Sequence, residues 1–335
     1  MSLNGISTLS TRQLRLEGKL TLAQAKRQGK VVAGDGTITG SVDPTKLYYR
    51  AANVYDANLL PTKYSGNTLV DNFGNLMPYH PWIDVLPTQL FSASEQGVMF
   101  DISNLASLFQ DVAGTIPVTT AGQTVALVKD KSGKGHDLTQ STLVNRPTWQ
   151  VDPYGYGYLA FDGINDFMVT NNIDLTGTAK VTASIGLLVD ATKVTAGVAM
   201  CTGGDPTSVN GTFLIGAPSS TADHSFYLRG TSTIQARVPN QVAGDDILTG
   251  VFDISQASKE LELIPRLSGV VSTNIVWTGT TAGTGNFANL PLYVGALGGT
   301  STFFKGHVYS IVVRGALSTS TEITNTETWI NDRLD

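Results

Sequence analysis

Apolar and polar positions alternate along most of the chain after about residue 97. Turn residues separate the alternating runs, as in the Gly-Gly pairs at 203–204 and 298–299. A period of two residues is typical of strands that bury one face. The segments predicted as strands are 125–128, 158–161, 167–170, 181–189, 198–201, 212–215, 225–229, 234–238, 247–252, 261–264, 270–277, 292–294 and 308–314. Short strands in such number, at this spacing, predict an all-β sandwich or jelly roll.

A helical period dominates near the N-terminus, over residues 9–29. Leu9, Leu16 and Leu20 recur at spacings of four or seven residues, and the basic residues Arg12 and Arg15 fall largely off that stripe. One interpretation is an ordinary amphipathic helix with a solvated basic face. The other is a docking helix, because no second helix nearby could cover the leucines and a partner would have to do so.

Two further helical segments are expected. Residues 101–110 indicate one or two helical turns with Ser103 as N-cap. Near the C-terminus, Thr319 and Glu322 have the spacing of a capping box, and Ile323 and Ile330 would share one face of the helix that follows. We expect this last helix to pack on the sandwich.

Residues 31–94 look unlike a self-contained domain. Proline interrupts the stretch repeatedly, yet it is rich in aromatic residues, among them Tyr48, Tyr49 and Trp82. Disordered segments are usually poor in aromatics, so an extended arm that buries its rings against a neighbouring subunit or its own sandwich is favoured. The neighbour is preferred, because long irregular segments are rare inside compact domains. The predicted division is a docking helix at 1–30, an extended arm at 31–94 and a sandwich at 95–335.

Composition narrows the functional classes. Charged residues make up 15% of the chain and glycine is frequent, with 35 residues, which favours strands and tight turns over helices. The net charge of −5 argues against nucleic acid as the main partner. Residues 1–50 hold eight basic and three acidic residues, a net of +5, so the remainder carries −10. We expect no disulfide, since Cys201 is the single cysteine, and no cleaved signal or membrane insertion.

Two long stretches resemble concanavalin A-like, laminin G-like jelly rolls. The segment GYLAFDGINDFMVT (157–170) is similar to their early strand pair, and LYVGALGG with FFKGHVYSIVVRGALSTSTEI (292–323) is similar to their closing strands. The lead-in KDKSGKGHDLTQSTLVNRPTW (129–149) resembles that of the same domain in phage virion proteins. The resemblance covers about residues 95–335 and implies a concanavalin A-like sandwich.

The first forty or so residues, beginning MSLNGISTLSTRQLRLEGKL, look like the N-terminal arm of structural proteins in tailed phages. The two resemblances together imply a virion component whose partners are other virion proteins and, in some members, a host-surface glycan. A tail fibre or adhesin and a capsid decoration protein both remain open, as does receptor binding as the main role. We also expect a homo-oligomer, because the N-terminal leucine stripe would otherwise stay in contact with water.

Enzymatic activity is not expected, although this fold also hosts glucan hydrolases. Those enzymes resemble one another in a strand that carries Glu-x-Asp-x-Glu or a close variant, which the sequence lacks. The nearest match is Glu260-Leu261-Glu262, interpreted as the solvent-facing side of an outer strand. A glycan depolymerase is therefore the less favoured alternative.

A weak candidate ligand site lies around one predicted hairpin. Aromatic rings stack on sugars, and the stacking candidates are Trp149, Tyr154 and Tyr156, although they could instead plug the end of the sandwich. The oxygen-bearing candidates are Asp162, Asn165 and Asp166. These three could coordinate calcium, but such clusters around a glycine serve mainly to form hairpin turns, so no metal and no cofactor is predicted.

Overall fold

The computed structural model describes residues 86–87, 89–152, 155–192, 195–218, 223–239 and 245–334, and the backbone of seven short strands before residue 80. The chain divides into two units, residues 1–86 and 87–334. In the first unit β1 (Lys30–Val32) pairs with β2 (Ile38–Ser41), and β3 (Tyr49–Arg50) pairs with β4 (Asn53–Val54). A third ladder is formed by β5 (Tyr64–Ser65), β6 (Thr68–Val70) and β7 (Leu76–Pro78).

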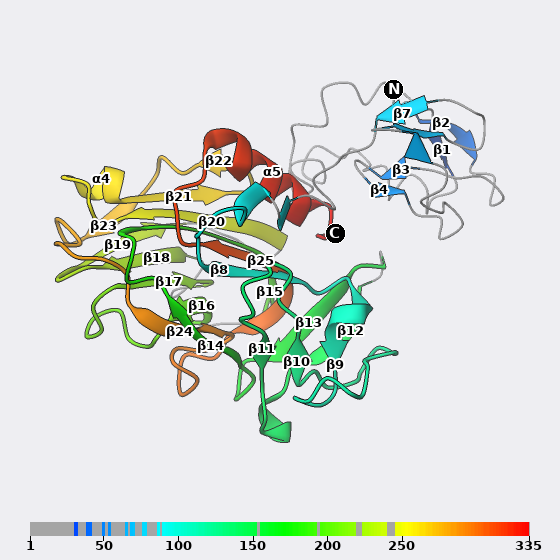
Figure 1. The fold of residues 1–335 in the computed structure, drawn as a ribbon, viewed down its shortest axis with the longest axis horizontal. Helices are drawn as coiled ribbons and strands as arrows, with labels where there is room; N and C mark the ends of the chain where they lie inside the picture. Colours follow the sequence, from blue (N-terminus) through cyan, green and yellow to red (C-terminus); the bar gives the residue numbers. More distant parts are fainter. Residues whose placement is uncertain are drawn as a thin grey trace. The chain divides into compact units, whose positions relative to one another are not determined.

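The second unit contains an antiparallel sheet of eight strands among its described residues (Figure 1). Its order is β12-β13-β25-β15-β20-β21-β22, and β8 also pairs with β25. The strands are β8 (Gly97–Asp101), β12 (Thr148–Val151), β13 (Gly157–Asp162), β15 (Lys180–Val189), β20 (Asp245–Asp253), β21 (Leu263–Leu267), β22 (Val270–Val271) and β25 (Lys305–Arg314).

A second antiparallel sheet has ten strands in the order β23-β19-β18-β17-β16-β24-β14-β11-β10-β9 in the described part of this unit. They are β9 (Leu108–Phe109), β10 (Leu127–Val128), β11 (Leu138–Thr139), β14 (Met168–Asp174), β16 (Val198–Thr202), β17 (Thr212–Gly216), β18 (His224–Arg229), β19 (Thr233–Val238), β23 (Val276–Thr278) and β24 (Asn289–Val294).

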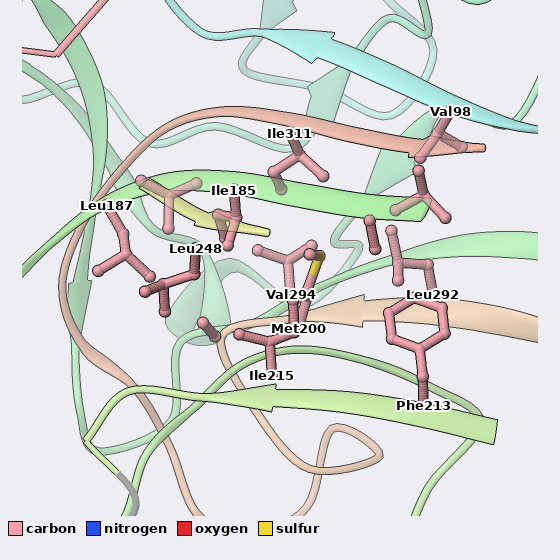
Figure 2. Packing of buried hydrophobic residues seen from close by; sticks show 14 of the residues in the cluster. Val98, Ile185, Leu187, Met200, Phe213, Ile215, Leu248, Leu292, Val294 and Ile311 are labelled. Carbon is pink, nitrogen blue, oxygen red and sulfur yellow. The ribbon is translucent and has the colours of Figure 1, made fainter. Parts of the chain in front are cut away.

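The hydrophobic core lies between the two sheets. Figure 2 shows Val98, Ile185 and Ile311 of the eight-stranded sheet above Met200, Phe213, Ile215 and Val294 of the ten-stranded sheet. All seven side chains are completely buried, with 0% exposure. The odd-numbered residues of β15 from 181 to 189 all belong to this core, as the period of two requires. The predicted all-β sandwich is therefore confirmed.

The predicted C-terminal helix is also confirmed. Helix α5 (Ser320–Asn331) begins at Thr319, whose hydroxyl accepts from the Glu322 backbone N–H while the Glu322 carboxylate accepts from the Thr319 N–H. The helix packs on β15, β20 and β25, on the side of the eight-stranded sheet away from the core (Figure 1). Ile323 and Ile330 are both buried there. No helix of the described residues is long and apolar enough to cross a membrane.

Two strand predictions were wrong, and one predicted helix cap was wrong. The segment 261–264 is not one strand, because the short helix α4 (Lys259–Glu262) occupies its first half and β21 starts at Leu263. The segment 270–277 is split between β22 and β23, which belong to different sheets. The helical turn predicted within residues 101–110 is present as the 3-10 helix η2 (Leu105–Ser107), but Asn104 and not Ser103 caps it. Another such turn, η3, spans Leu143–Asn145.

The cap changes because Ser103 has another partner. Its hydroxyl donates to the Asp101 carboxylate at 2.6 Å, whereas the Asn104 side chain accepts from the Ala106 N–H. The predicted N-terminal helix at 9–29 lies outside the described residues. The proposed division at residues 30 and 94 stays a prediction.

Candidate functional site

Two of the three aromatic residues predicted to stack on a ligand are buried, and one of them, Trp149, belongs to the core between the sheets. Trp149 is 7% exposed and its indole N–H donates to the Ile102 carbonyl at 3.2 Å. Its ring fills the space above Gly157, where an added Cβ would come within 2.9 Å of the indole nitrogen. Tyr156 is 6% exposed. The structure thus favours the packing interpretation for both residues, while Tyr154 lies outside the described residues.

The three residues predicted to offer oxygen atoms to a ligand, Asp162, Asn165 and Asp166, lie in one turn between β13 and β14. One oxygen of the Asp162 carboxylate accepts from the backbone N–H groups of Ile164, Asn165 and Asp166, at 2.7, 3.2 and 3.4 Å. The Asp162 N–H in turn donates to the Asp166 carboxylate at 3.0 Å. Gly163 adopts a positive φ of 76°, which this tight turn requires. The arrangement is that of a hairpin turn closed by its own side chains.

The Asp166 carboxyl is buried, at 8% exposure. Burial, and then the neighbouring charge of Asp162, raise its pKa to about 6. Among the described residues no group of three or more His, Cys, Asp or Glu side chains is placed to hold a metal ion.

The predicted particle-docking residues cannot be placed. Tyr49 lies in the short strand β3, of which only the backbone is described. The other docking residues lie outside the described residues: Leu9, Arg12, Arg15, Leu16, Leu20, Tyr48 and Trp82.

The outer face of the eight-stranded sheet, the face away from the core, is divided into two halves. In the covered half, under α5, Thr182, Ser184 and Gly186 of β15 are buried. An added Cβ on Gly186 would come within 2.5 Å of both Ile330 and Leu334, so the C-terminal segment is packed directly on the strand. In the open half the same row continues with Leu188 of β15 and with Asp190, which directly follows the strand. The open half consists of Tyr158, Ala160, Asp162, Leu188, Asp190, Lys305 and His307.

Strand register brings the residues of the open half together. Ala160 of β13 lies opposite His307 of β25, which in turn lies opposite Leu188 of β15. Asp162 lies opposite Lys305. Directly opposite residues in an antiparallel pair point to the same face, so all of these side chains lie on the outside of the sandwich. Their inward neighbours Leu159 and Phe161 belong to the core.

Two stacked rings stand in the open half. The centroids of Tyr158 and His307 are 3.8 Å apart and their planes are 19° from parallel. Both residues are half-buried. The stack is supported from one side by the buried Tyr309, whose centroid is 5.5 Å from that of Tyr158. The stack is therefore a fixed pair of partly exposed rings on the outside of the sheet.

Charged groups border the stack. The Lys305 ammonium donates to the Thr192 hydroxyl at 2.5 Å and lies 3.8 Å from the Asp190 carboxylate. Asp190 also accepts from the backbone N–H and hydroxyl of Thr192, and these bonds lower its pKa. Asp162 is exposed on the other side of Lys305. The border therefore offers carboxylate acceptors together with one ammonium donor.

Burial shifts the pKa values of both stacked rings towards their neutral forms. Burial and the charge of Asp152 raise the pKa of Tyr158. Burial lowers the pKa of His307, and the charge of Asp190 only partly opposes this. Because the buried Nδ1 of His307 has no hydrogen-bond partner among the described residues, an imidazolium would bury an unsatisfied donor. His307 is accordingly neutral near pH 7.

Of the residues of the open half, only Asp162 is among the ligand-site candidates that the sequence suggested. The available signal was the alternation of Tyr158, Ala160 and Asp162 with core residues, which marks them as outward-facing. Alternation does not show that β25 lies beside β13, because the two strands are some 140 residues apart in the sequence.

The interpretation of Glu260 and Glu262 as the solvent-facing side of a strand was wrong. Glu262 is completely buried at the end of α4. Its carboxylate accepts from the Ala282 N–H at 2.9 Å and from the Thr281 hydroxyl at 2.7 Å. It thereby anchors the loop before β24, while Glu260 stays exposed on the outside. The pair does not present two carboxylates to one substrate.

No protein-family model and no curated protein matches the chain. The solved structures similar to it include the receptor-binding domain of botulinum neurotoxin D, with 7% identity and a TM-score of 0.44 over 69% of this chain and 52% of that one. Another is the ligand-binding domain of serotype D in complex with N-acetylneuraminic acid, with 7% identity, a TM-score of 0.43 and coverage of 72% and 52%. The receptor-binding domain of type G matches with 8% identity, a TM-score of 0.43 and coverage of 69% and 50%. The chain thus spans about half the length of these structures.

Proposed function

We propose that the chain is a binding protein rather than a catalyst, and that its sandwich takes a carbohydrate on the open half of the eight-stranded sheet. The observation that carries the proposal is the supported Tyr158–His307 stack beside Lys305, Asp190 and Asp162. Each of these side chains is at least partly exposed on a rigid sheet.

The chemistry of sugars fits this combination. A pyranose ring has an apolar face and a rim of hydroxyl groups, so it needs an aromatic surface with hydrogen-bonding groups around it. Tyr158 and His307 supply the surface. Asp162 and Asp190 accept hydrogen bonds from hydroxyl groups, and Lys305 donates them. Strands hold these groups more precisely than loops would.

The test is a glycan array with the full-length chain and two matched tyrosine variants. Tyr158→Ala removes a ring from the open half, whereas Tyr293→Ala removes a half-buried tyrosine from the ten-stranded sheet. Wild type and Tyr293→Ala should bind the same glycans, and Tyr158→Ala should lose them while it melts cooperatively. Binding that persists in Tyr158→Ala, or absence of binding by the wild type, would contradict the proposal.

We further propose that the chain is a structural component of a phage particle, as a tail fibre or adhesin or as a capsid decoration protein. The support is the resemblance of residues 1–41 to phage arms and the positive charge of residues 1–50. On this proposal the arm docks on other virion proteins, the chain self-associates, and the sandwich faces outward towards a host-surface glycan.

Imaging of assembled particles with and without residues 1–86 tests this second proposal. The deletion should abolish incorporation, and Leu16→Asp with Leu20→Asp should weaken it. Particles that incorporate the deleted chain as well as the full-length chain would show that the arm is not the anchor. If receptor binding is instead the main role, particles that lack the chain should assemble normally but should fail to adsorb to the host.

A further inference from the structure

We infer that the open half selects an uncharged, hydroxyl-rich sugar and rejects an anionic one. The inference rests on the proposed carbohydrate binding and adds the chemical class of the ligand. Its basis is the balance of fixed charges around the Tyr158–His307 stack, together with the contacts that Lys305 already makes.

The charge balance is unfavourable for an anion. The open half contains two carboxyl groups, Asp162 and Asp190, against the one ammonium of Lys305, and the charge of the buried Asp152 also acts on Tyr158. His307 adds no positive charge near pH 7, because burial lowers its pKa. A uronate or sialate carboxylate placed on the stack would meet a net negative field, and like charges brought together at an interface oppose binding.

Lys305 is not available as a dedicated anion donor. Its ammonium is held between the Thr192 hydroxyl and the Asp190 carboxylate. The Thr192 hydroxyl in turn donates to Asp190 at 2.6 Å, so the three groups form a closed set. To bind an anion, Lys305 would have to leave this set and expose Asp190 beside the new charge. A neutral hydroxyl can join the set without that loss, because it both donates and accepts.

The carboxylates suit hydroxyl donors. An ionised carboxyl donates nothing and can accept through two oxygens. In Asp162 and Asp190 the bonds from the backbone and from Thr192 go to one oxygen of each carboxylate, so acceptor capacity remains for adjacent sugar hydroxyls. Hydrogen bonds to charged groups are also stronger than those between neutral groups. The open half therefore pairs an aromatic platform with an acceptor-rich border, which matches a neutral hexose better than an acidic sugar.

The chain contains a matched pair of aspartates for the test. Asp190 and Asp174 each follow or end a strand, and each accepts from both the N–H and the hydroxyl of the threonine two residues later. Asp190→Asn and Asp174→Asn remove the same charge and keep the same turn. Only Asp190 belongs to the open half, since Asp174 ends β14 in the other sheet.

The experiment measures binding of neutral hexose oligosaccharides and of oligogalacturonate to the full-length chain at low ionic strength. Wild type should bind a neutral oligosaccharide and bind oligogalacturonate at least about tenfold more weakly. Asp190→Asn should raise the affinity for oligogalacturonate by about fivefold, the scale of one surface charge pair, and Asp174→Asn should not.

Each other outcome is decisive. Preference for oligogalacturonate that depends on Tyr158 and Lys305 would overturn the inference and leave the proposed function standing. Equal responses of the two asparagine variants would also overturn it, because the charge would then act from a distance. Failure of the wild type to bind either class would refute the proposed function and, with it, the inference.

Discussion

The covered and open halves of the eight-stranded sheet are built by the same strands, yet they carry different residues. Under α5 the outer row of β15 holds Thr182, Ser184 and Gly186, which are small and buried. In the open half the row continues with Leu188 and Asp190, which are half-buried. The first half is shaped to receive a helix, and the second presents rings and charges to solvent.

The ion pairs follow the same division. Arg266 and Glu327 form two bonds of 2.8 Å between β21 and α5, and Arg333 meets Asp101 of β8 at 3.0 and 3.2 Å. These pairs are largely buried. The Lys305–Asp190 pair of the open half is about one third exposed, with a longer contact of 3.8 Å. Substitutions in the covered half should therefore affect folding, and those in the open half should affect binding.

The largest effect is expected for Asp101→Ala in the covered half. Burial alone would raise the pKa of Asp101, but the charges of Arg333 and Lys131 hold it below its ordinary value. Removing the carboxylate leaves Arg333 buried and without its counter-ion, which should lower the free energy of unfolding by about 3–5 kcal/mol. Urea denaturation measures this loss.

The control for that variant is Glu260→Ala. Glu260 pairs with Lys259 at 3.9 Å on the surface, with 57% of its side chain exposed. Its removal should change the free energy of unfolding by less than about 0.5 kcal/mol. Similar losses in the two variants would mean that burial does not distinguish the ion pairs of this protein.

The next effect is expected for Gly186→Ala, also in the covered half. The added methyl would overlap Ile330 and Leu334, both buried, so α5 would have to shift. Overpacking of this kind costs about 1–3 kcal/mol. Gly177→Ala is the control, because nothing lies within 4 Å of its added Cβ. Thermal unfolding should show a lower melting temperature for Gly186→Ala than for Gly177→Ala if α5 packs as closely on β15 as the contacts indicate.

Asp166→Asn, beside the open half, should raise the free energy of unfolding, whereas the preceding substitutions lower it. The pKa of Asp166 is about 6 in the fold against an ordinary 3.8, so the folded state binds the proton more tightly. Stability from this group is therefore present below about pH 4 and is lost as the pH rises to about 6. Removing the charge should add about 1 kcal/mol to the free energy of unfolding at pH 7.5, and little at pH 4.

Asp174→Asn is the control for this pH dependence. Hydrogen bonds from Thr176 lower the pKa of Asp174, so loss of its charge should not stabilise the fold at pH 7.5. Unfolding curves at pH 4 and pH 7.5 compare the two variants. A gain for Asp166→Asn that persists at pH 4 would show that its origin is packing and not ionisation.

The smallest effect on stability is expected for Ala160→Gln in the centre of the open half. Ala160 is half-buried opposite His307, and a longer polar side chain can extend into solvent there. The free energy of unfolding should stay within about 0.5 kcal/mol of the wild type. Carbohydrate binding should nevertheless fall, because the side chain would cover the Tyr158–His307 stack. A stable variant with unchanged affinity would place the ligand elsewhere.

The local pattern of residues determined most of the sandwich. Alternation predicted the long strands β13, β15 and β25, and a capping box predicted the start of α5. These features depend on neighbours two to four residues apart, which a sequence displays directly. The same reasoning failed at Glu262, whose burial depends on a loop some 20 residues away.

Only the tertiary structure decided which outward-facing residues become neighbours. Arg333 meets Asp101 across 232 positions, and His307 lies on Tyr158 because β25 pairs with β13 in one register. Alternation shows which side of a strand faces outward, but it does not show which strand lies beside it or where a helix covers the sheet. The division into a covered and an open half, and with it the candidate site, follows from strand order and from the seat of α5 on Gly186.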